Sequence, residues 1–287
     1  MKNVKVNILL ALFAIVGLSL SCTTDSDSGS GSGGNSRQRV VSKIIFENVE
    51  YDYADEYAFK YDSYGRITSV TQIEDPYDDF CHYEYYKYGY GSGLEIWEEE
   101  VYVDIYDATL NNKGYLSEVY YEDGDYTDEW SYTYDSKGRL TRIYNVFGEY
   151  EESWSETTYS WSGGNIVEVR YEYEDDLEDY SETIEKQLSY NSKSMDIVNL
   201  DLNAAIAGWF EGLYIDVCDE HYWGDGLCGK KSKNFLTGWL TSWVADDGEG
   251  QWRCSLKWSY DEDGYPVAVI VTDETGDEYS VRIVYKS

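Results

Sequence analysis

Polar and apolar residues alternate with a period of two along most of the chain. Between residues 126 and 134, aromatic and acidic residues fall on one side, and Thr, Glu and Ser fall on the other. Residues 167–174 and 252–260 alternate in the same way. Because successive side chains of a strand point to opposite faces, this pattern predicts β-strands with one aromatic face and one polar face.

Short strings with Asp or Asn and a Gly three residues later separate these strands. The clearest are "YDSYGRIT" at 61–68 and "YDSKGRLT" at 134–141, and weaker copies span 111–114 and 261–264. An Asp or Asn side chain can accept hydrogen bonds from the backbone two residues on, and Gly takes positive φ at little cost. Each string therefore predicts a tight turn with a glycine bulge between two antiparallel strands.

These elements predict an all-β protein. We expect about fourteen strands in one large meandering antiparallel sheet, curled into a barrel or half-barrel, over residues 43–287. A membrane-spanning barrel is the alternative, because its strands also alternate. We favour a sheet that does not span the membrane, because its apolar face is mostly Tyr and Trp and because Glu98, Glu99 and Glu100 run through one strand.

The N-terminal residues predict export and lipidation. Residues 1–21 combine Lys2 and Lys5 with an apolar run, as in a lipoprotein signal peptide, and "SLSC" ends at Cys22. We expect a lipidated Cys22 and a flexible Gly/Ser-rich tether over residues 22–42. The lipid would hold the protein at the outer membrane, facing the cell surface, with the periplasmic face as the alternative.

Residues 200–250 interrupt the strand pattern. Asn203 precedes a run rich in Ala and is expected to cap a short helix, within an insertion of mixed loop and helix. The insertion either plugs one end of the sheet or presents a surface to a ligand or partner. The residues that we expect to bind a ligand are Trp209, Trp223, Lys230, Lys231, Trp239 and Trp243.

Four cysteines remain after Cys22. Cys218 and Cys228 flank a short Gly-containing loop and are expected to form a disulfide, while Cys81 and Cys254 either pair or are buried thiols. Zinc bound through Cys218, His221 and Cys228 would lack an evident fourth ligand. The sequence thus predicts no metal, no cofactor and no catalytic motif.

The charge of the chain limits its partners. A net charge of −34 arises from 56 acidic and 22 basic residues. This charge repels nucleic acid and anionic membrane surfaces. We therefore expect attachment to the membrane through lipid alone, and no contact with nucleic acid.

Several segments occur together in this chain: "SLSC", the hairpins, "NLDLN" at 199–203, "GKKSKNFL" at 229–236 and "WSYDEDGYPVAVIVTD" at 258–273. With this combination the chain resembles a Bacteroidetes lipoprotein family of unknown function whose domain has a porin-like β fold. The resemblance implies a fold and a location but no catalytic residues. The loop "DVCDEHYWGDGLCG" departs from the family's plainer apolar linker.

These observations predict a non-enzymatic, lipid-anchored, acidic protein of the cell surface that binds a ligand or partner. Carbohydrate is our first expectation for the ligand, because Trp and Tyr side chains stack on sugar rings. The alternatives are a purely structural protein that interacts with envelope proteins, and a hydrolase that uses paired carboxylates.

Overall fold

The fold is described from a computed structural model, which places residues 38–48, 53–73, 80–86, 92–99, 103–148, 153–175, 180–209, 226–246 and 248–287. The strands are β1 (Val41–Asn48), β2 (Tyr53–Tyr61), β3 (Ile67–Ile73), β4 (Phe80–Tyr86), β5 (Ser92–Glu99), β6 (Val103–Leu110), β7 (Leu116–Asp123), β8 (Tyr126–Tyr134), β9 (Leu140–Gly148), β10 (Ser153–Ser162), β11 (Asn165–Asp175), β12 (Tyr180–Ser194), β13 (Asn234–Ala245), β14 (Gly248–Tyr260), β15 (Pro266–Thr272) and β16 (Glu278–Tyr285). A 3-10 helix, η1 (Met195–Ile197), and an α-helix, α1 (Leu202–Trp209), lie between β12 and β13.

The strands form a closed antiparallel barrel, which confirms the predicted all-β fold and its neighbour-paired hairpins. Each strand pairs with the next along the chain, and β1 pairs with β16 through a register that includes Ile44 opposite Ile283. The described residues contain sixteen strands, two more than we expected. β1 begins at Val41, two residues before the predicted start of the domain.

The predicted tight turns are confirmed at all four Asp or Asn positions. In the turn at 135–138, the Asp135 carboxylate accepts hydrogen bonds from the amides of Lys137 and Arg139, at 2.9 and 3.0 Å. Gly138 has a φ of 79°, which glycine adopts far more cheaply than other residues. The β8–β9 register shifts beside this turn, as expected for a glycine bulge.

The two faces of the barrel wall differ as the alternation predicts. In β8, Trp130 and Tyr132 are buried on the inward face, while Ser131 and Thr133 are exposed on the outward face. The outward face carries ion pairs between neighbouring strands. These pairs are Lys43 with Glu56, Glu47 with Arg282, Arg142 with Glu156, and Arg170 with Glu185.

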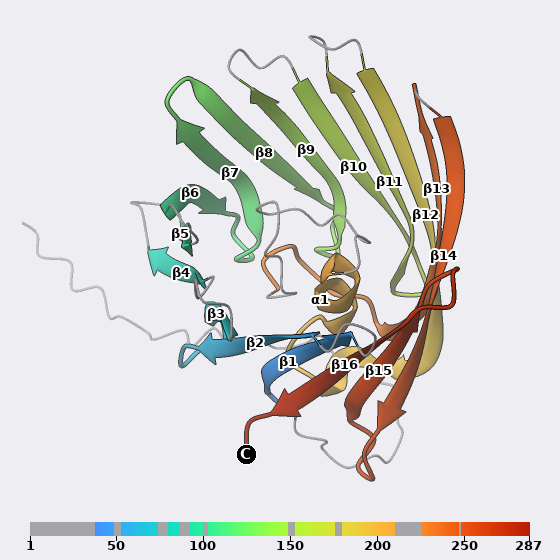
Figure 1. The fold of residues 1–287 in the computed structure, drawn as a ribbon. Helices are drawn as coiled ribbons and strands as arrows, with labels where there is room; N and C mark the ends of the chain where they lie inside the picture. The colour runs from blue at the N-terminus through green and yellow to red at the C-terminus, as the bar shows by residue number, and fades with distance from the viewer. Residues whose placement is uncertain are drawn as a thin grey trace, which may run out of the picture. The chain divides into compact units, whose positions relative to one another are not determined.

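The insertion fills part of the interior, and we call residues 195–209 and 226–233 the plug. α1 lies within the ring of strands (Figure 1), and its residues Leu202, Ile206 and Ala207 are fully buried. The predicted boundary at residue 250 was wrong, because β13 begins at Asn234. Trp239 and Trp243 therefore belong to the barrel wall.

The predicted helix cap was also wrong. Asp201 caps α1, since its Oδ1 accepts hydrogen bonds from the amides of Asn203 and Ala204 at 3.1 and 3.2 Å. The Asn203 side chain instead joins the helix to β13. It donates to the carbonyl of Asn234 at 2.8 Å and accepts from the amide of Leu236 at 2.8 Å.

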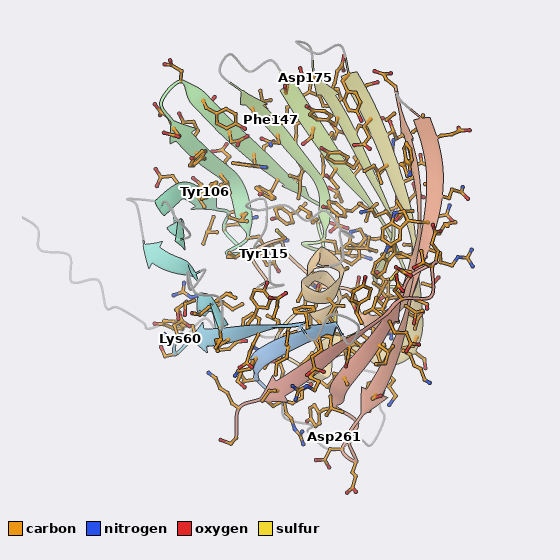
Figure 2. All side chains as sticks on the ribbon, viewed as in Figure 1. Lys60, Tyr106, Tyr115, Phe147, Asp175 and Asp261 are labelled. Atoms are coloured by element: carbon orange, nitrogen blue, oxygen red, sulfur yellow. The ribbon has the colours of Figure 1, made fainter. Side chains whose placement is uncertain are left out.

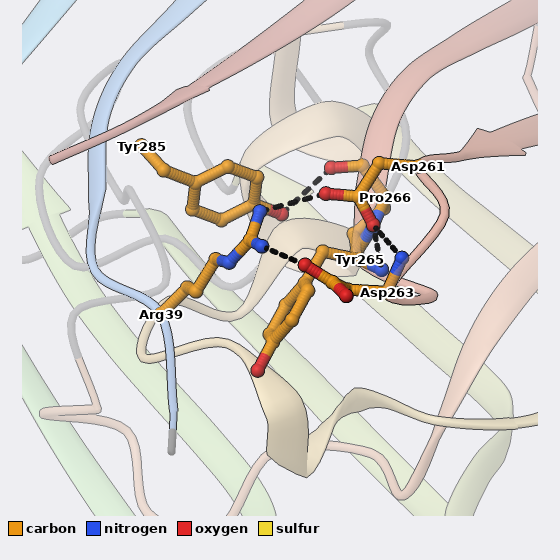
Figure 3. Close-up of polar contacts among 6 residues, drawn as sticks. All are labelled: Arg39, Asp261, Asp263, Tyr265, Pro266 and Tyr285. Atoms are coloured by element: carbon orange, nitrogen blue, oxygen red, sulfur yellow. Dashed lines mark hydrogen bonds and ion pairs between the residues drawn. The ribbon is translucent and has the colours of Figure 1, made fainter. Parts of the chain in front are cut away.

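Backbone hydrogen bonds join the plug to the barrel end that carries the four turns. The amide of Lys230 donates to the Gly138 carbonyl at 3.0 Å, and the amide of Lys233 donates to the Gly164 carbonyl at 2.9 Å. Arg39 reaches the same end, where it donates to Asp261 and Asp263 at 2.7 Å and stacks on Tyr265 (Figure 3). The plugged end is therefore also the end at which the described chain begins.

Candidate functional site

The interior of the barrel has two zones along β8–β14. Near the turn end, the wall packs on the plug through buried apolar side chains such as Leu140, Phe235 and Leu236. Beyond α1 the strands continue toward the opposite end (Figure 1). The inward side chains there are mostly half-buried aromatic residues, mixed with small polar ones and with the carboxylates of Asp128 and Asp175, and we call this zone the aromatic wall.

Stacked rings run along the aromatic wall. Phe147 of β9 stacks on Tyr173 of β11 with ring centroids 6.0 Å apart, and Tyr173 contacts Tyr180 of β12 at the same distance. Farther round the barrel, Tyr106 of β6 stacks on Tyr121 of β7 with ring centroids 4.8 Å apart. Figure 2 shows Phe147 and Asp175 on the long strands, toward the end opposite the turn that carries Asp261.

Trp243 of β13 lies flat over two glycines of β14. A Cβ atom added to Gly250 would lie 2.6 Å from Trp243 Nε1, and one added to Gly248 would lie 3.5 Å from its ring. Gly250 is the direct partner of Trp243 in the register of the two strands. One face of the indole therefore covers the β14 backbone, and the other face is directed to the interior. Trp243 is half-buried.

Trp239 and Thr241 precede Trp243 on the same inward face of β13. Trp239 is 2% exposed and Thr241 is 3% exposed. Trp239 meets Trp252 of β14 edge to face, with ring centroids 6.0 Å apart. Neither Trp239 Nε1 nor Thr241 Oγ1 has a hydrogen-bond partner. The structure thus brings together two of the expected ligand-binding residues, Trp239 and Trp243.

Lys231 has a structural role in the plug. Its Nζ donates to the carbonyls of Met195 and Val198 at 3.0 and 2.6 Å. Burial lowers the pKa of Lys231 and raises the pKa of Asp201, the carboxylate that interacts with it. Lys230 is exposed at the turn end and lies apart from the β13 tryptophans. The two lysines therefore do not form one binding site with Trp239 and Trp243.

Other expected site residues lie partly or wholly outside the described ranges. Trp223 and Cys218 are not among the described residues, so the predicted disulfide of Cys218 with buried Cys228 stays a prediction. Trp209 ends α1, but its side chain is not described. The signal peptide and Cys22 also lie outside these ranges.

Cys254 is a buried thiol that forms no disulfide, which decides between the two predicted alternatives for this residue. Burial, followed by the nearby charge of Asp273, raises its pKa to about 12. Within the described ranges, no cluster of three or more His, Cys, Asp or Glu side chains is placed to hold a metal ion. The helices in these ranges are too short or too polar to cross a membrane.

Comparison with known families identifies the fold. Residues 59–268 match the model of DUF4595, a domain of unknown function with a porin-like fold. The chain belongs to this family. The match spans the candidate site from the aromatic wall to Trp252, and it confirms the family resemblance of the sequence.

Two solved structures share the fold of this DUF4595 chain. A porin-like protein from Bacteroides vulgatus ATCC 8482 is 13% identical with a TM-score of 0.61, and one from Bacteroides uniformis ATCC 8492 is 16% identical with a TM-score of 0.60. In both cases the alignment covers 87% of this chain and 99% of the other. No curated protein matches the chain.

Two residues of the candidate site, Thr241 and Gly250, were not predicted from the sequence. A signal for Gly250 exists in "WVADDGEG" at 243–250, which reads as a hairpin that places Gly opposite Trp. A glycine that faces a tryptophan across a hairpin leaves room for the ring to lie flat. The sequence around Thr241 gives no comparable signal, because only the folded structure shows that its hydroxyl group lacks a hydrogen-bond partner.

Proposed function

We propose that this protein is a lipid-anchored, non-enzymatic binding protein of the outer membrane, and that the inward face of its β13–β14 hairpin binds carbohydrate. The observation that carries the proposal is Trp243. Its indole is held flat by Gly248 and Gly250, so that one ring face is presented to the barrel interior. A flat aromatic face beside a few polar groups is typical of sites that bind sugar rings.

The surroundings of Trp243 support a ligand with both apolar faces and polar edges. Trp252 contributes a second aromatic ring, and Thr241, which lies opposite Trp252, contributes a hydroxyl group. The Oγ1 atom of Thr241 is buried without a hydrogen-bond partner. A sugar offers hydroxyl groups that both donate and accept hydrogen bonds, together with ring faces that stack.

The charge of the outer wall supports attachment by lipid rather than by spanning strands. Ion pairs such as Arg282 with Glu47 and Arg142 with Glu156 lie on the outward face. Barrels that span a membrane place an apolar band there, because charged groups are costly in hydrocarbon. We propose that lipid on Cys22 and the tether that follows it hold the barrel at the outer membrane, facing the cell surface.

A glycan array tests the binding function. Purified full-length protein would be applied to arrays that carry neutral hexose, pentose and N-acetylhexosamine oligosaccharides. We expect binding that Trp243→Ala reduces at least about tenfold, which corresponds to about 1.4 kcal/mol. Trp154→Ala is the matched control, because Trp154 stacks on Tyr144 on the outward face and should leave binding unchanged. An array without any binding would contradict the proposal.

Three further measurements test the lipid anchor, the orientation at the cell surface and the absence of catalysis. Cys22→Ala should abolish incorporation of labelled fatty acid, and protease added to intact cells should digest the lipidated protein if it faces outward. An oligosaccharide recovered after incubation with the protein should have unchanged mass. Cleavage products would favour the hydrolase alternative.

A purely structural or envelope-interacting protein is the second candidate. The observation that favours it is the filled interior near the turn end. There, Lys231 stabilises the plug by donating hydrogen bonds to backbone carbonyls. This candidate predicts crosslinks to an envelope protein that persist in Trp243→Ala, together with negative glycan arrays.

A further inference from the structure

Two buried polar atoms on β13 lack partners within the protein. Trp239 Nε1 and Thr241 Oγ1 are both enclosed, and neither makes a hydrogen bond. Buried polar atoms in native proteins are almost always bonded to protein or to ordered water. Two such atoms lie only two residues apart, on the same face of one strand, so a group from outside the chain, either water or a ligand, can complete their hydrogen bonding.

The position of the two atoms links them to the aromatic ring of the proposed site. Successive inward residues of β13 are Trp239, Thr241 and Trp243. Thr241 lies opposite Trp252 on one side, and opposite buried Lys186 of β12 on the other. The two atoms thus lie on the plug side of Trp243, where the half-buried aromatic wall passes into the packed core.

We propose that Trp239 Nε1 and Thr241 Oγ1 form a hydrogen-bonding subsite for one hydroxyl group of a neutral sugar whose ring stacks on Trp243. This inference rests on the proposed function, because it names the group through which that site recognises its ligand.

The chemistry of the two atoms favours a hydroxyl group. An indole Nε1 can only donate, so its partner must present an acceptor oxygen. A threonine hydroxyl can both donate and accept. A sugar hydroxyl accepts from Trp239 and donates to Thr241, which satisfies both atoms with one group. A site built to pair with a hydroxyl rejects analogues that lack it, because its buried polar atoms are then left without partners.

The test uses variants that remove one polar atom at a time. Thr241→Val replaces the hydroxyl with a methyl group of similar shape, and Trp239→Phe removes the Nε1 donor. Thr133→Val is the matched control, since Thr133 is exposed on the outward face of β8. The affinity of each full-length variant would be measured by calorimetry for a neutral oligosaccharide that binds the wild type on the array.

We expect both interior variants to weaken binding about tenfold each and Thr133→Val to leave it unchanged. Equal affinity of Thr241→Val and the wild type would overturn the subsite while leaving the proposed function intact. A wild type that binds no neutral oligosaccharide would overturn both.

A second measurement on Thr241→Val needs no ligand. Because the Thr241 hydroxyl has no partner in the free protein, its replacement by a methyl group should maintain or raise the urea midpoint of unfolding. A lowered midpoint would show that an ordered water already satisfies the hydroxyl, and this outcome would also overturn the subsite. Trp239→Phe would be compared only if its circular dichroism spectrum matches that of the wild type.

Discussion

The backbone amide of Lys230 donates a hydrogen bond of 3.0 Å to the carbonyl oxygen of Gly138. Gly138 is the glycine of the repeated Asp-x-x-Gly turn, and Lys230 belongs to the plug. The turn at 135–138 thus connects two strands of a hairpin and also accepts a hydrogen bond from the plug. The neighbour of Lys230, Gly229, has a φ of 92°, and a Cβ atom there would lie 2.7 Å from the same carbonyl.

Gly229→Ala should therefore destabilise the protein strongly. A positive φ is energetically unfavourable for alanine, and its Cβ would also clash with Gly138 and with the Tyr134 ring. We expect a loss of about 2–4 kcal/mol in the free energy of unfolding, measured with urea. Gly226→Ala is the matched control, with a φ of 86° and no atom within 4 Å of the added Cβ. It should lose only about 1 kcal/mol. Equal losses of unfolding free energy in the two variants would contradict this expectation, because they would show that the plug accommodates the Cβ at residue 229 without strain.

Arg39 should contribute more to stability than an ordinary surface arginine. Its guanidinium donates to two carboxylates and lies over the Tyr265 ring at 3.9 Å (Figure 3). Its backbone also bonds to Ile197 and Asn199 of the plug. Arg39→Ala should lose about 1–2 kcal/mol of unfolding free energy, because the paired groups are only partly screened by solvent.

Arg66→Ala serves as the control for Arg39. Arg66 pairs with Asp62 inside one exposed turn and lies farther from its nearest ring, at 5.4 Å from Tyr64. This variant should change the unfolding free energy by less than about 0.5 kcal/mol. Similar losses for the two variants would contradict a special role of Arg39 at the plugged end.

Asp201 gives the stability of the protein a defined pH dependence. Burial raises its pKa above the ordinary value of 3.8. A carboxyl group whose folded pKa is raised contributes stability that is present below the unfolded pKa and is lost as the pH rises through the folded pKa. Asp201→Asn keeps the cap on α1 but cannot ionise. The stability of the wild type relative to Asp201→Asn should therefore fall as the pH rises from about 4, and level off above the raised pKa.

Urea unfolding of both proteins in steps from about pH 3.5 to 8 measures this difference. A difference that increases with pH would show that attraction by Lys231 outweighs burial at Asp201.

Gly250 should determine the position of Trp243. In Gly250→Ala the new Cβ would lie 2.6 Å from Trp243 Nε1, so the ring must lift from β14. We expect weaker binding of the array-positive oligosaccharide by about tenfold, measured by calorimetry. Gly248→Ala is the control, because its Cβ would make ordinary contact with the ring at 3.5 Å. Unchanged affinity in Gly250→Ala would show that the flat orientation of Trp243 is not needed.

The repeated hairpins could be predicted because their signals are local. Asp135 and Gly138 fix a turn through contacts within five residues, and the alternation around Trp130 marks one face of a strand. Closure of the ring could not be predicted in this way. The pairing of β1 with β16 joins the two ends of the domain, and no local pattern encodes it.

The errors in the insertion have a physical cause. β13 packs on the plug near Phe235 and Leu236, so both of these neighbours are buried and the alternation that marks a strand is lost. For this reason Trp239 and Trp243, which belong to β13, were assigned to the insertion from the sequence. At α1, Asp201 and Asn203 are both good caps by residue type, and only the contacts of Asn203 with β13 decide between them.

A crystal structure of the full-length protein with an array-positive neutral oligosaccharide would show directly whether sugar binds at Trp243. We expect a sugar ring across the interior face of Trp243, with one hydroxyl oxygen within about 3.2 Å of both Trp239 Nε1 and Thr241 Oγ1. A sugar bound on the outward face of the barrel, with Trp243 bare and the two polar atoms unchanged, would contradict it.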